Sequence, residues 1–166
     1  MITIMILLAF FAAVFLYVKL NNYEIETGGI FQIKDMKIET NNSEESKIVF
    51  DIISSTESMV EPSISILEEN DPIYVGEKKV KDTSLGKYRV ELMFNDTRFQ
   101  KSIRKNMGLK KHSIASEMEG AILESLKVAY PPDDSKMVIY FGCNVKPQVI
   151  YQHDDNKFEV ILKKVV

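Results

Sequence analysis

The chain has 166 residues, of which 45% are apolar and 27% are charged, and it carries 24 acidic against 21 basic side chains. This makeup is that of an ordinary folded protein and excludes a long disordered or collagen-like chain. The net charge of −3 argues against a generic nucleic-acid binder, which usually has a strongly basic balance. The single cysteine, Cys143, excludes an intramolecular disulfide and a cysteine-rich zinc site, so the fold must be held by its own core.

The most apolar part of the sequence is its first 20 residues. Met1 to Val18 contain no charged side chain, and eleven of these residues are Ile, Leu, Phe or Val. A helix over this run would be about 27 Å long, close to the hydrocarbon thickness of a bilayer. Tyr17 and Lys19 stand where interfacial residues anchor a membrane helix. The sequence therefore predicts a transmembrane signal-anchor helix over residues 1–20 that contacts lipid, and hence a single-pass membrane protein.

A cleaved signal peptide is the alternative interpretation of this segment. It would need basic residues before the apolar run and small residues at a cleavage site, and the sequence has neither pattern. The side of the membrane that holds the rest of the chain stays open. Lys19, Lys34 and Lys37 favour a cytoplasmic domain by the positive-inside rule. N-glycosylation sequons at Asn41 and Asn95 favour the opposite side.

A polar neck, residues 21–29, separates the predicted helix from a soluble domain over residues 30–166. In the first half of this domain, apolar and polar residues alternate with the period of two that is typical of half-buried strands. The alternation predicts strands at residues 30–38, 47–53 and 63–67, and Pro72 favours a turn and an edge segment at residues 71–76.

The clearest strand pattern covers Tyr88 to Phe94. Its apolar residues fall on one face and Arg89 and Glu91 fall on the other, so we expect one face against a core and the other in water. The segment Leu85-Gly86-Lys87-Tyr88 resembles the turn and tyrosine that begin a late strand in immunoglobulin-like sandwiches. This resemblance covers about ten residues without the cysteine and tryptophan hallmarks, so it implies a sandwich-like first half and no function.

Two helices are predicted after this strand. The first begins at Asp96 or Thr97 as an N-cap and ends at Gly108. The second begins at Ser113 or Ser116 and ends before the two prolines at residues 131–132. Its apolar residues have the spacing of one helical face: Ile114, Met118, Ile122, Leu126 and Ala129.

Strand patterns return in the last third of the chain, at residues 137–141, 148–151 and 158–165, with a hairpin loop at residues 153–157. The first of these is apolar throughout, as in a buried central strand. The order of strands, two helices and strands predicts an α+β domain with a mostly antiparallel sheet, in which the two helices are inserted before the last three strands.

A basic patch is the most informative polar feature. Between Thr97 and His112 there are six basic residues and no acidic one: Arg98, Lys101, Arg104, Lys105, Lys110 and Lys111. The helical spacing of Arg98, Lys101 and Lys105 predicts a basic helix face that binds lipid headgroups, nucleic acid or an acidic partner. The alternative is a solvated face whose cations balance the acidic remainder of the chain. Nucleic acid is the least favoured ligand, because only Phe99 is interleaved with the basic residues.

Residues with catalytic or metal-binding chemistry are few. Cys143 with His112 or His153 is the one Cys/His combination, but a cysteine after an apolar strand is more typical of a core residue than of an activated thiolate. His153, Asp154 and Asp155 are neighbours in one loop, and adjacent ligands of this kind rarely complete a metal site. We therefore expect no catalytic residue, no metal and no cofactor.

These patterns together predict a non-enzymatic, membrane-anchored structural or assembly component. Its expected partners are other proteins of a membrane-associated complex, such as a virion or envelope assembly, together with the lipid around residues 1–20. The alternative function is a membrane-tethered anion-binding module that uses the basic patch.

Overall fold

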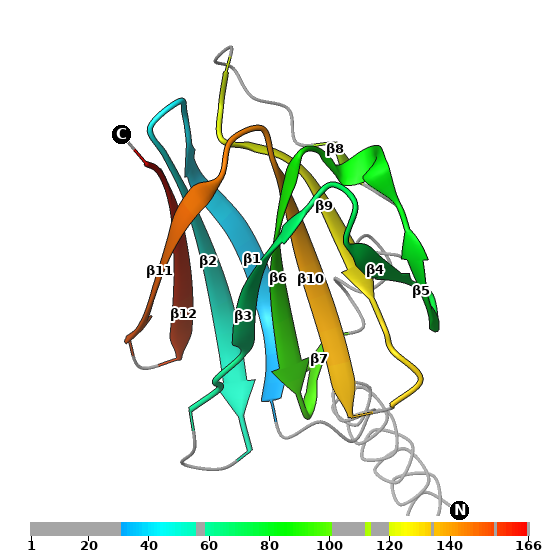
Figure 1. The fold of residues 1–166 in the computed structure, drawn as a ribbon. Coiled ribbons are helices and arrows are strands. Elements are labelled where there is room, and N and C mark those ends of the chain that lie inside the picture. Colours follow the sequence, from blue (N-terminus) through cyan, green and yellow to red (C-terminus); the bar gives the residue numbers. More distant parts are fainter. Residues whose placement is uncertain are drawn as a thin grey trace, which may run out of the picture.

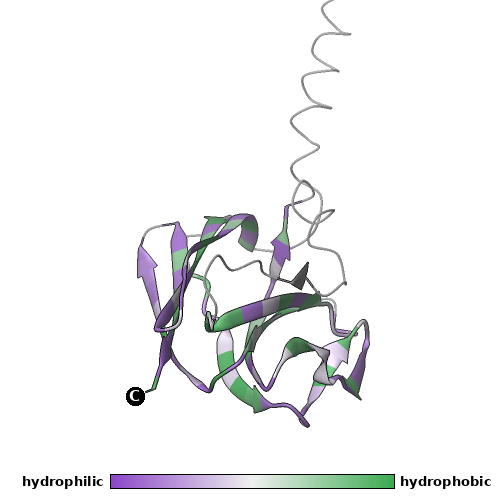
Figure 2. Ribbon diagram, turned by 90° about the horizontal axis from the view of Figure 1, so that it is seen from above, coloured by the Kyte–Doolittle hydropathy of each residue, from purple (hydrophilic) through white to green (hydrophobic). Residues whose placement is uncertain are grey.

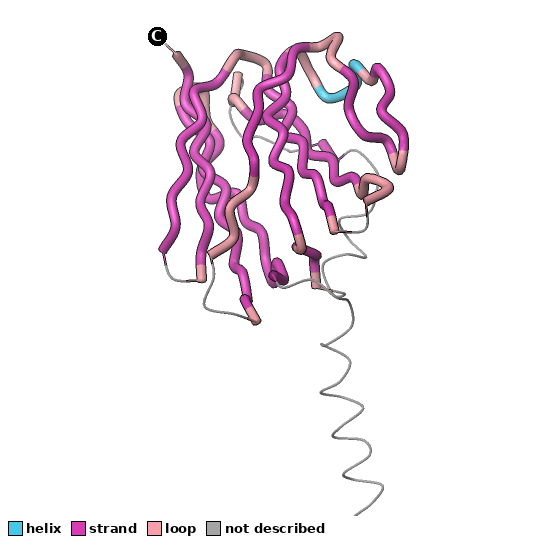
Figure 3. The backbone as a smooth tube through the Cα atoms, turned by 60° about the horizontal axis from the view of Figure 1, so that its bottom comes forward, coloured by secondary structure: helices cyan, strands magenta, loops and turns pink. Residues whose placement is uncertain are grey.

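The computed structural model describes residues 31–55, 59–100, 112–113, 120–133, 135–154 and 156–165. The predicted transmembrane helix at residues 1–20 lies outside these ranges, and none of the helical structure inside them has the length and apolar character to cross a membrane. The described chain is nearly all strand, and its helical structure is one short 3-10 turn, η1 (Thr83–Leu85), which is cyan in Figure 3.

Two five-stranded sheets form a β-sandwich (Figure 1). Sheet A has the order β11–β12–β2–β1–β7, and sheet B has the order β3–β6–β10–β9–β8. The strands of sheet A are β1 (Phe31–Asn41), β2 (Glu45–Ser54), β7 (Thr97–Phe99), β11 (Pro147–Asp154) and β12 (Lys157–Lys164). Those of sheet B are β3 (Ser63–Glu68), β6 (Tyr88–Asn95), β8 (His112–Ser113), β9 (Leu123–Ala129) and β10 (Lys136–Cys143). Neighbouring strands are antiparallel except for β1 and β7, which are parallel.

The core between the sheets is centred on four phenylalanines. The ring of Phe50 on β2 lies 6.0 Å from that of Phe94 on β6, 6.4 Å from that of Phe141 on β10 and 5.8 Å from that of Phe158 on β12. Phe94 and Phe158 also meet edge to face across the sheets, at 6.1 Å. All four side chains are fully buried. Each comes from the inward-facing residues of its own strand. Figure 2 shows hydrophilic and hydrophobic residues mixed along the strands.

The outer face of sheet B is covered by a third layer. A hairpin of β4 (Pro72–Val75) and β5 (Lys78–Lys81), followed by η1, lies against β10 and β9 (Figure 1). Ile73 and Leu85 from this layer pack against Val138, Tyr140 and Ala129 of the sheet. We call residues 71–87 the cover segment. The middle of sheet B, at β10 and β9, is therefore buried on both faces.

The prediction of an α+β domain with two inserted helices is wrong. The first predicted helix begins where the structure has strand β7, and the end of the second coincides with strand β9. Residues 101–111 and 114–119, which make up the rest of both predictions, lie outside the described residues. The strand predictions are confirmed as β1, β2, β3, β6, β10, β11 and β12, and the last two form the predicted hairpin.

The pattern of β9 misled the prediction because the strand is covered on both faces. Leu126 and Val128 face the core, while Ser125, Lys127 and Ala129 face the cover segment. Two-sided burial hides the period-two alternation that identifies a half-buried strand. Residues four positions apart also lie on one face in both a helix and a strand, so Ile122 and Leu126 fit either structure. The expectation that Arg89 and Glu91 face water fails for the same reason, because both are buried by the cover segment and β3.

Gly142 on β10 is the point where the cover segment touches sheet B most closely. A Cβ atom at this position would collide with the carbonyl of Leu85 and the hydroxyl of Ser125. The Leu85 oxygen is backbone and is held by a 2.8 Å hydrogen bond from Ser125 Oγ, so it has little freedom to retreat. The close approach therefore requires glycine.

We predict that Gly142→Ala lowers the free energy of unfolding by about 1–3 kcal/mol, because overpacking a close contact usually costs this much. Urea unfolding followed by circular dichroism measures this loss. Ser125→Ala is the control, because it removes one hydrogen bond and one colliding atom but leaves the Leu85 carbonyl in place. The double variant Gly142→Ala with Ser125→Ala is the decisive comparison. If it is as stable as Ser125→Ala alone, the contact with the Leu85 backbone is not the constraint.

Candidate functional site

One of the six residues of the predicted basic patch lies in the described structure. Arg98 is on strand β7. The prediction that it begins a basic helix face with Lys101 and Lys105 is therefore wrong for Arg98. Its guanidinium donates to the carbonyl of Thr97 at 2.9 Å and lies 5.7 Å from the ring of Tyr130. The remaining five residues lie outside the described ranges, and the patch stays a prediction: Lys101, Arg104, Lys105, Lys110 and Lys111.

The histidines and Cys143 are not brought together. His112 is on β8 and His153 is on β11, and these strands are at opposite ends of different sheets. Cys143 is fully buried in the core, where its thiol faces the carbonyl of Phe141 at 3.7 Å. Asp154 is exposed, Asp155 lies outside the described residues, and the described acidic, histidine and cysteine side chains include no group of three that could hold a metal ion.

Burial raises the pKa of the Cys143 thiol to about 12, with a smaller effect from Glu124. The thiol is therefore neutral at physiological pH and has no route to the solvent.

We predict that Cys143 does not react with a disulfide reagent such as DTNB in the native protein at pH 8, and that it reacts fully in 6 M guanidinium. Absorbance of the released thiolate measures both rates. A native rate close to the denatured rate would mean that the thiol is accessible and would restore it as a candidate nucleophile.

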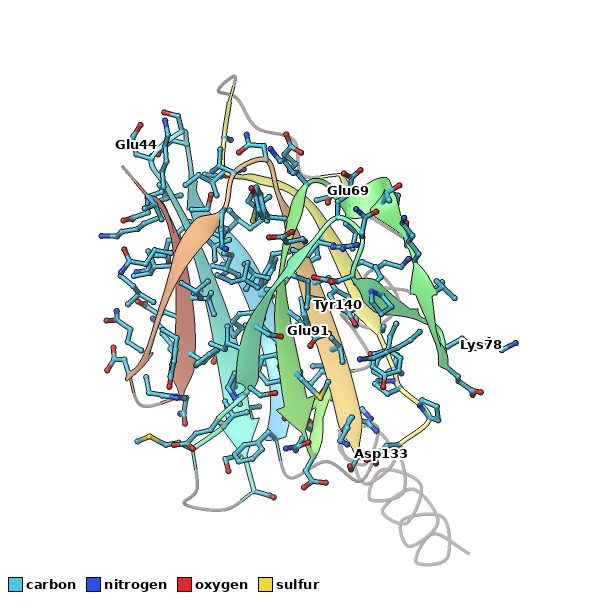
Figure 4. The ribbon with its side chains drawn as sticks, in the orientation of Figure 1. Glu44, Glu69, Lys78, Glu91, Asp133 and Tyr140 are labelled. Carbon is cyan, nitrogen blue, oxygen red and sulfur yellow. The ribbon has the colours of Figure 1, made fainter. Side chains whose placement is uncertain are left out.

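The sequence did not reveal a polar network beneath the cover segment. Ser65, Glu91, Tyr140 and Lys127 form one cross-strand row on the outer face of sheet B, from β3 through β6 and β10 to β9. Ser65 Oγ donates to Glu91 Oε1 at 3.1 Å, and the Tyr140 hydroxyl accepts from the backbone N–H of Tyr74 on β4 at 2.9 Å. Burial raises the pKa of Tyr140 well above its usual value. Figure 4 shows Tyr140 and Glu91 near each other on this face, with Lys78 pointing outward at the tip of the hairpin.

Arg89 and Lys127 fasten the cover segment to the sheet. The fully buried guanidinium of Arg89 donates to the carbonyls of Asp82 at 2.7 Å and Asp71 at 3.0 Å. Lys127 Nζ forms an ion pair with Asp82 Oδ2 at 2.8 Å, and Asp82 Oδ1 also accepts from the backbone N–H of Ser84 at the start of η1. These polar groups bind one another and the backbone of the chain itself, so the network acts as a structural clamp.

The hydrogen bonds from Lys127 and Ser84 hold the pKa of Asp82 well below its usual range. Because the pKa of a free Asp is about 3.9, this carboxylate stabilises the fold at neutral pH, and its contribution is lost as the pH falls through the depressed folded-state value.

We predict that Asp82→Asn destabilises the protein by about 1.5–3 kcal/mol at pH 7, the usual value of a hydrogen bond to a charged group. The difference from the parent protein should shrink as the pH falls below about 4, because the unfolded parent then binds a proton at Asp82 that the folded parent does not bind. Denaturant unfolding at a series of pH values measures the difference. A difference that is constant down to pH ~2 would contradict the clamp, because it would show that ionisation of Asp82 is not involved.

One of the apolar regions on the described surface lies along one side of the sandwich. Phe158 of β12 contacts Phe94 of β6, so the strands next to them, β11 and β3, are the edge strands on the same side (Figure 1). Tyr151 on β11 faces inward against Phe158, at a ring distance of 6.0 Å, yet it is 53% exposed. Ile66 on β3 pairs with the buried Val90 and is 37% exposed. We call this region, with Val149 and Ile150, the open side.

The open side continues the aromatic core to the surface. The rings of Tyr151 and His153 rest on Phe158, at 6.0 and 5.0 Å, and Phe158 rests on Phe50 and Phe94. These contacts fix the exposed ring of Tyr151 in one place before any partner arrives. A fixed, half-exposed tyrosine is the type of side chain that anchors protein interfaces.

Strand β11 itself lacks the features that usually protect an edge strand from other chains. It contains no lysine or arginine, and its eight residues pair with β12 without a bulge. Its one proline, Pro147, is at its first residue. Unprotected edges of this kind accept further strands, because their outer N–H and C=O groups have no partner within the sheet.

The outer face of sheet A is different, because it is covered by paired charges. Lys47 lies between Glu39 at 3.2 Å and Glu159 at 3.1 Å, and Glu159 also accepts from Gln152 at 2.6 Å. The charges of this ladder are satisfied by one another, with Glu39 exposed and Glu159 buried. The open side is therefore the strongest candidate for a binding surface.

The fold and this surface define a β-sandwich protein with an accessible edge strand. Comparisons of the sequence with protein-family models, and of the chain with curated proteins and with solved structures, find no match. The residues of the open side were not identified from the sequence, although the lack of a basic residue in segment 147–154 is a signal that could have marked an unprotected edge.

Proposed function

We propose that this chain is a non-enzymatic, membrane-anchored assembly component whose β-sandwich binds another protein chain along the open side. The single observation that carries the proposal is Tyr151, which is held by the aromatic core and is still more than half exposed. The predicted helix at residues 1–20 would hold the domain at a membrane, and the sandwich would supply the contact.

Binding would follow the physics of strand addition. An extended segment of the partner pairs its backbone with the free edge of β11, and its alternate side chains cover Tyr151 and Ile66. Backbone hydrogen bonds then supply part of the affinity, and the apolar side chains supply register and specificity. The burial of Cys143 and the internal pairing of Asp82 and Lys127 support a binding role over a catalytic one.

We predict that Ile150→Lys weakens the association at least tenfold, because it places a charge on the edge that the partner must approach. A tagged copy of the full-length protein, parent or variant, is produced together with an untagged copy of the same sequence and purified from the membrane in mild detergent. The proteins retained with the tagged copy, the untagged copy included, are quantified by mass spectrometry.

Val80→Lys is the matched control, because Val80 lies on another exposed strand, β5, and is 39% exposed, against 38% for Ile150. We expect this variant to retain the partners of the parent protein. Thermal unfolding of both variants verifies that the fold is intact. Equal retention by the parent and by Ile150→Lys would refute the proposal.

A further inference from the structure

We infer that the chain accepted by β11 is β11 of a second copy of this protein, paired antiparallel about a two-fold axis at Ile150. The inference rests on the proposed binding function and names its partner. It is carried by the order of side chains in segment 146–154, which is complementary to itself when one copy is reversed against the other.

The two ends of the segment have opposite charges. Lys146 immediately precedes β11 and Asp154 is its last residue, and both are exposed. In an antiparallel pair centred on Ile150, Lys146 of each copy lies opposite Asp154 of the other. A parallel pair in the same register would instead place like charges opposite each other, which is destabilising. Charge therefore selects the antiparallel arrangement.

The side chains between the two ends also match. Ile150 lies opposite Ile150 of the second copy, and Gln148 lies opposite its Gln152, all on the outer face of sheet A. On the inner face, Val149 lies opposite Tyr151 of the second copy, so each half-exposed tyrosine gains an apolar neighbour. Aromatic and β-branched residues form favourable cross-strand pairs. Pro147 lies opposite His153 in the one remaining kind of row, which is neither favourable nor repulsive in charge. The other rows join apolar to apolar, amide to amide, or cation to anion.

The pairing joins two copies of sheet A into one continuous sheet, with both copies of sheet B on the same side. The same surface is used twice, as in an isologous dimer. Because the paired strands run in opposite directions, β1 begins at opposite ends of the two sandwiches. If both chains are anchored in one membrane, the strands of the dimer would run along the membrane surface. If the two chains are anchored in two facing membranes, the dimer would join these membranes across the space between them. Detergent micelles impose neither arrangement, so the test uses the full chain in detergent.

The first experiment is a charge exchange measured by sedimentation velocity over a range of protein concentrations. Lys146→Asp and Asp154→Lys each place like charges opposite one another, and we expect each to raise the dimer dissociation constant at least tenfold. The double variant, Lys146→Asp with Asp154→Lys, restores opposite charges only if the partner is the same chain. We expect its dissociation constant to return to within about threefold of the parent value, allowing for imperfect additivity.

The second experiment tests the register. In Ile150→Cys the two introduced thiols face each other at the axis, within roughly 4.5–5.5 Å between Cβ atoms, close to the separation in a disulfide. Mild oxidation should give a covalent dimer through residue 150, because Cys143 is buried. Val80→Cys, at an equally exposed position, should give no covalent dimer under the same conditions.

The outcomes separate this inference from the proposed function. A dimer that is weakened by both single exchanges, restored by the double exchange and cross-linked through residue 150 supports the inference. A monomeric parent protein overturns it, and so does a double variant that stays dissociated. If the parent is monomeric but Ile150→Lys still loses a different protein from the membrane extract, the partner is another chain and the proposed function stands. If neither association exists, both fail.

Discussion

The packing of Phe50 against three phenylalanines from neighbouring and opposite strands is the contact on which the other features of this fold depend. Phe50 touches Phe158 within its own sheet and both Phe94 and Phe141 across the interface. Tilted and edge-to-face pairs of this kind add to the burial of apolar area and fix the relative position of the strands that carry them. Because the chain has no disulfide, these contacts and the surrounding aliphatic residues hold the two sheets together.

The same cluster explains why one side of the sandwich is suited to binding. Phe158 extends the aromatic contacts to His153 and Tyr151 on the edge strand, so the exposed tyrosine stands on a rigid core. A binding residue that is already ordered loses less conformational entropy when a partner arrives. The same aromatic contacts therefore stabilise the core and order the exposed tyrosine of the open side.

The two outer faces of the sandwich show opposite ways of dealing with polar residues. On sheet A, charged side chains neutralise one another in partly exposed ladders, such as Lys47 between the exposed Glu39 and the buried Glu159. On sheet B, the cover segment buries Arg89 and Glu91, and the buried guanidinium is compensated by backbone carbonyls and the Asp82–Lys127 pair beside it. Burying such groups is tolerated only because these partners are supplied, which is why the cover segment is tied to the sheet at several points.

The sequence by itself determined the half-buried strands β1 and β2, because their alternation reports one covered face. It also determined strand β6, but not the cover over its polar face, and the central strand β10 from its unbroken apolar run. It also indicated that Cys143 is a core residue. Only the tertiary structure decided that segment 123–129 is a strand, since that choice depends on a sheet neighbour and a cover segment distant in sequence. The open side was likewise decided in three dimensions. Whether a strand such as β11 has one neighbour or two is set by the pairing of whole strands, so the lack of basic residues in this segment becomes informative only once the strand is known to be at an edge.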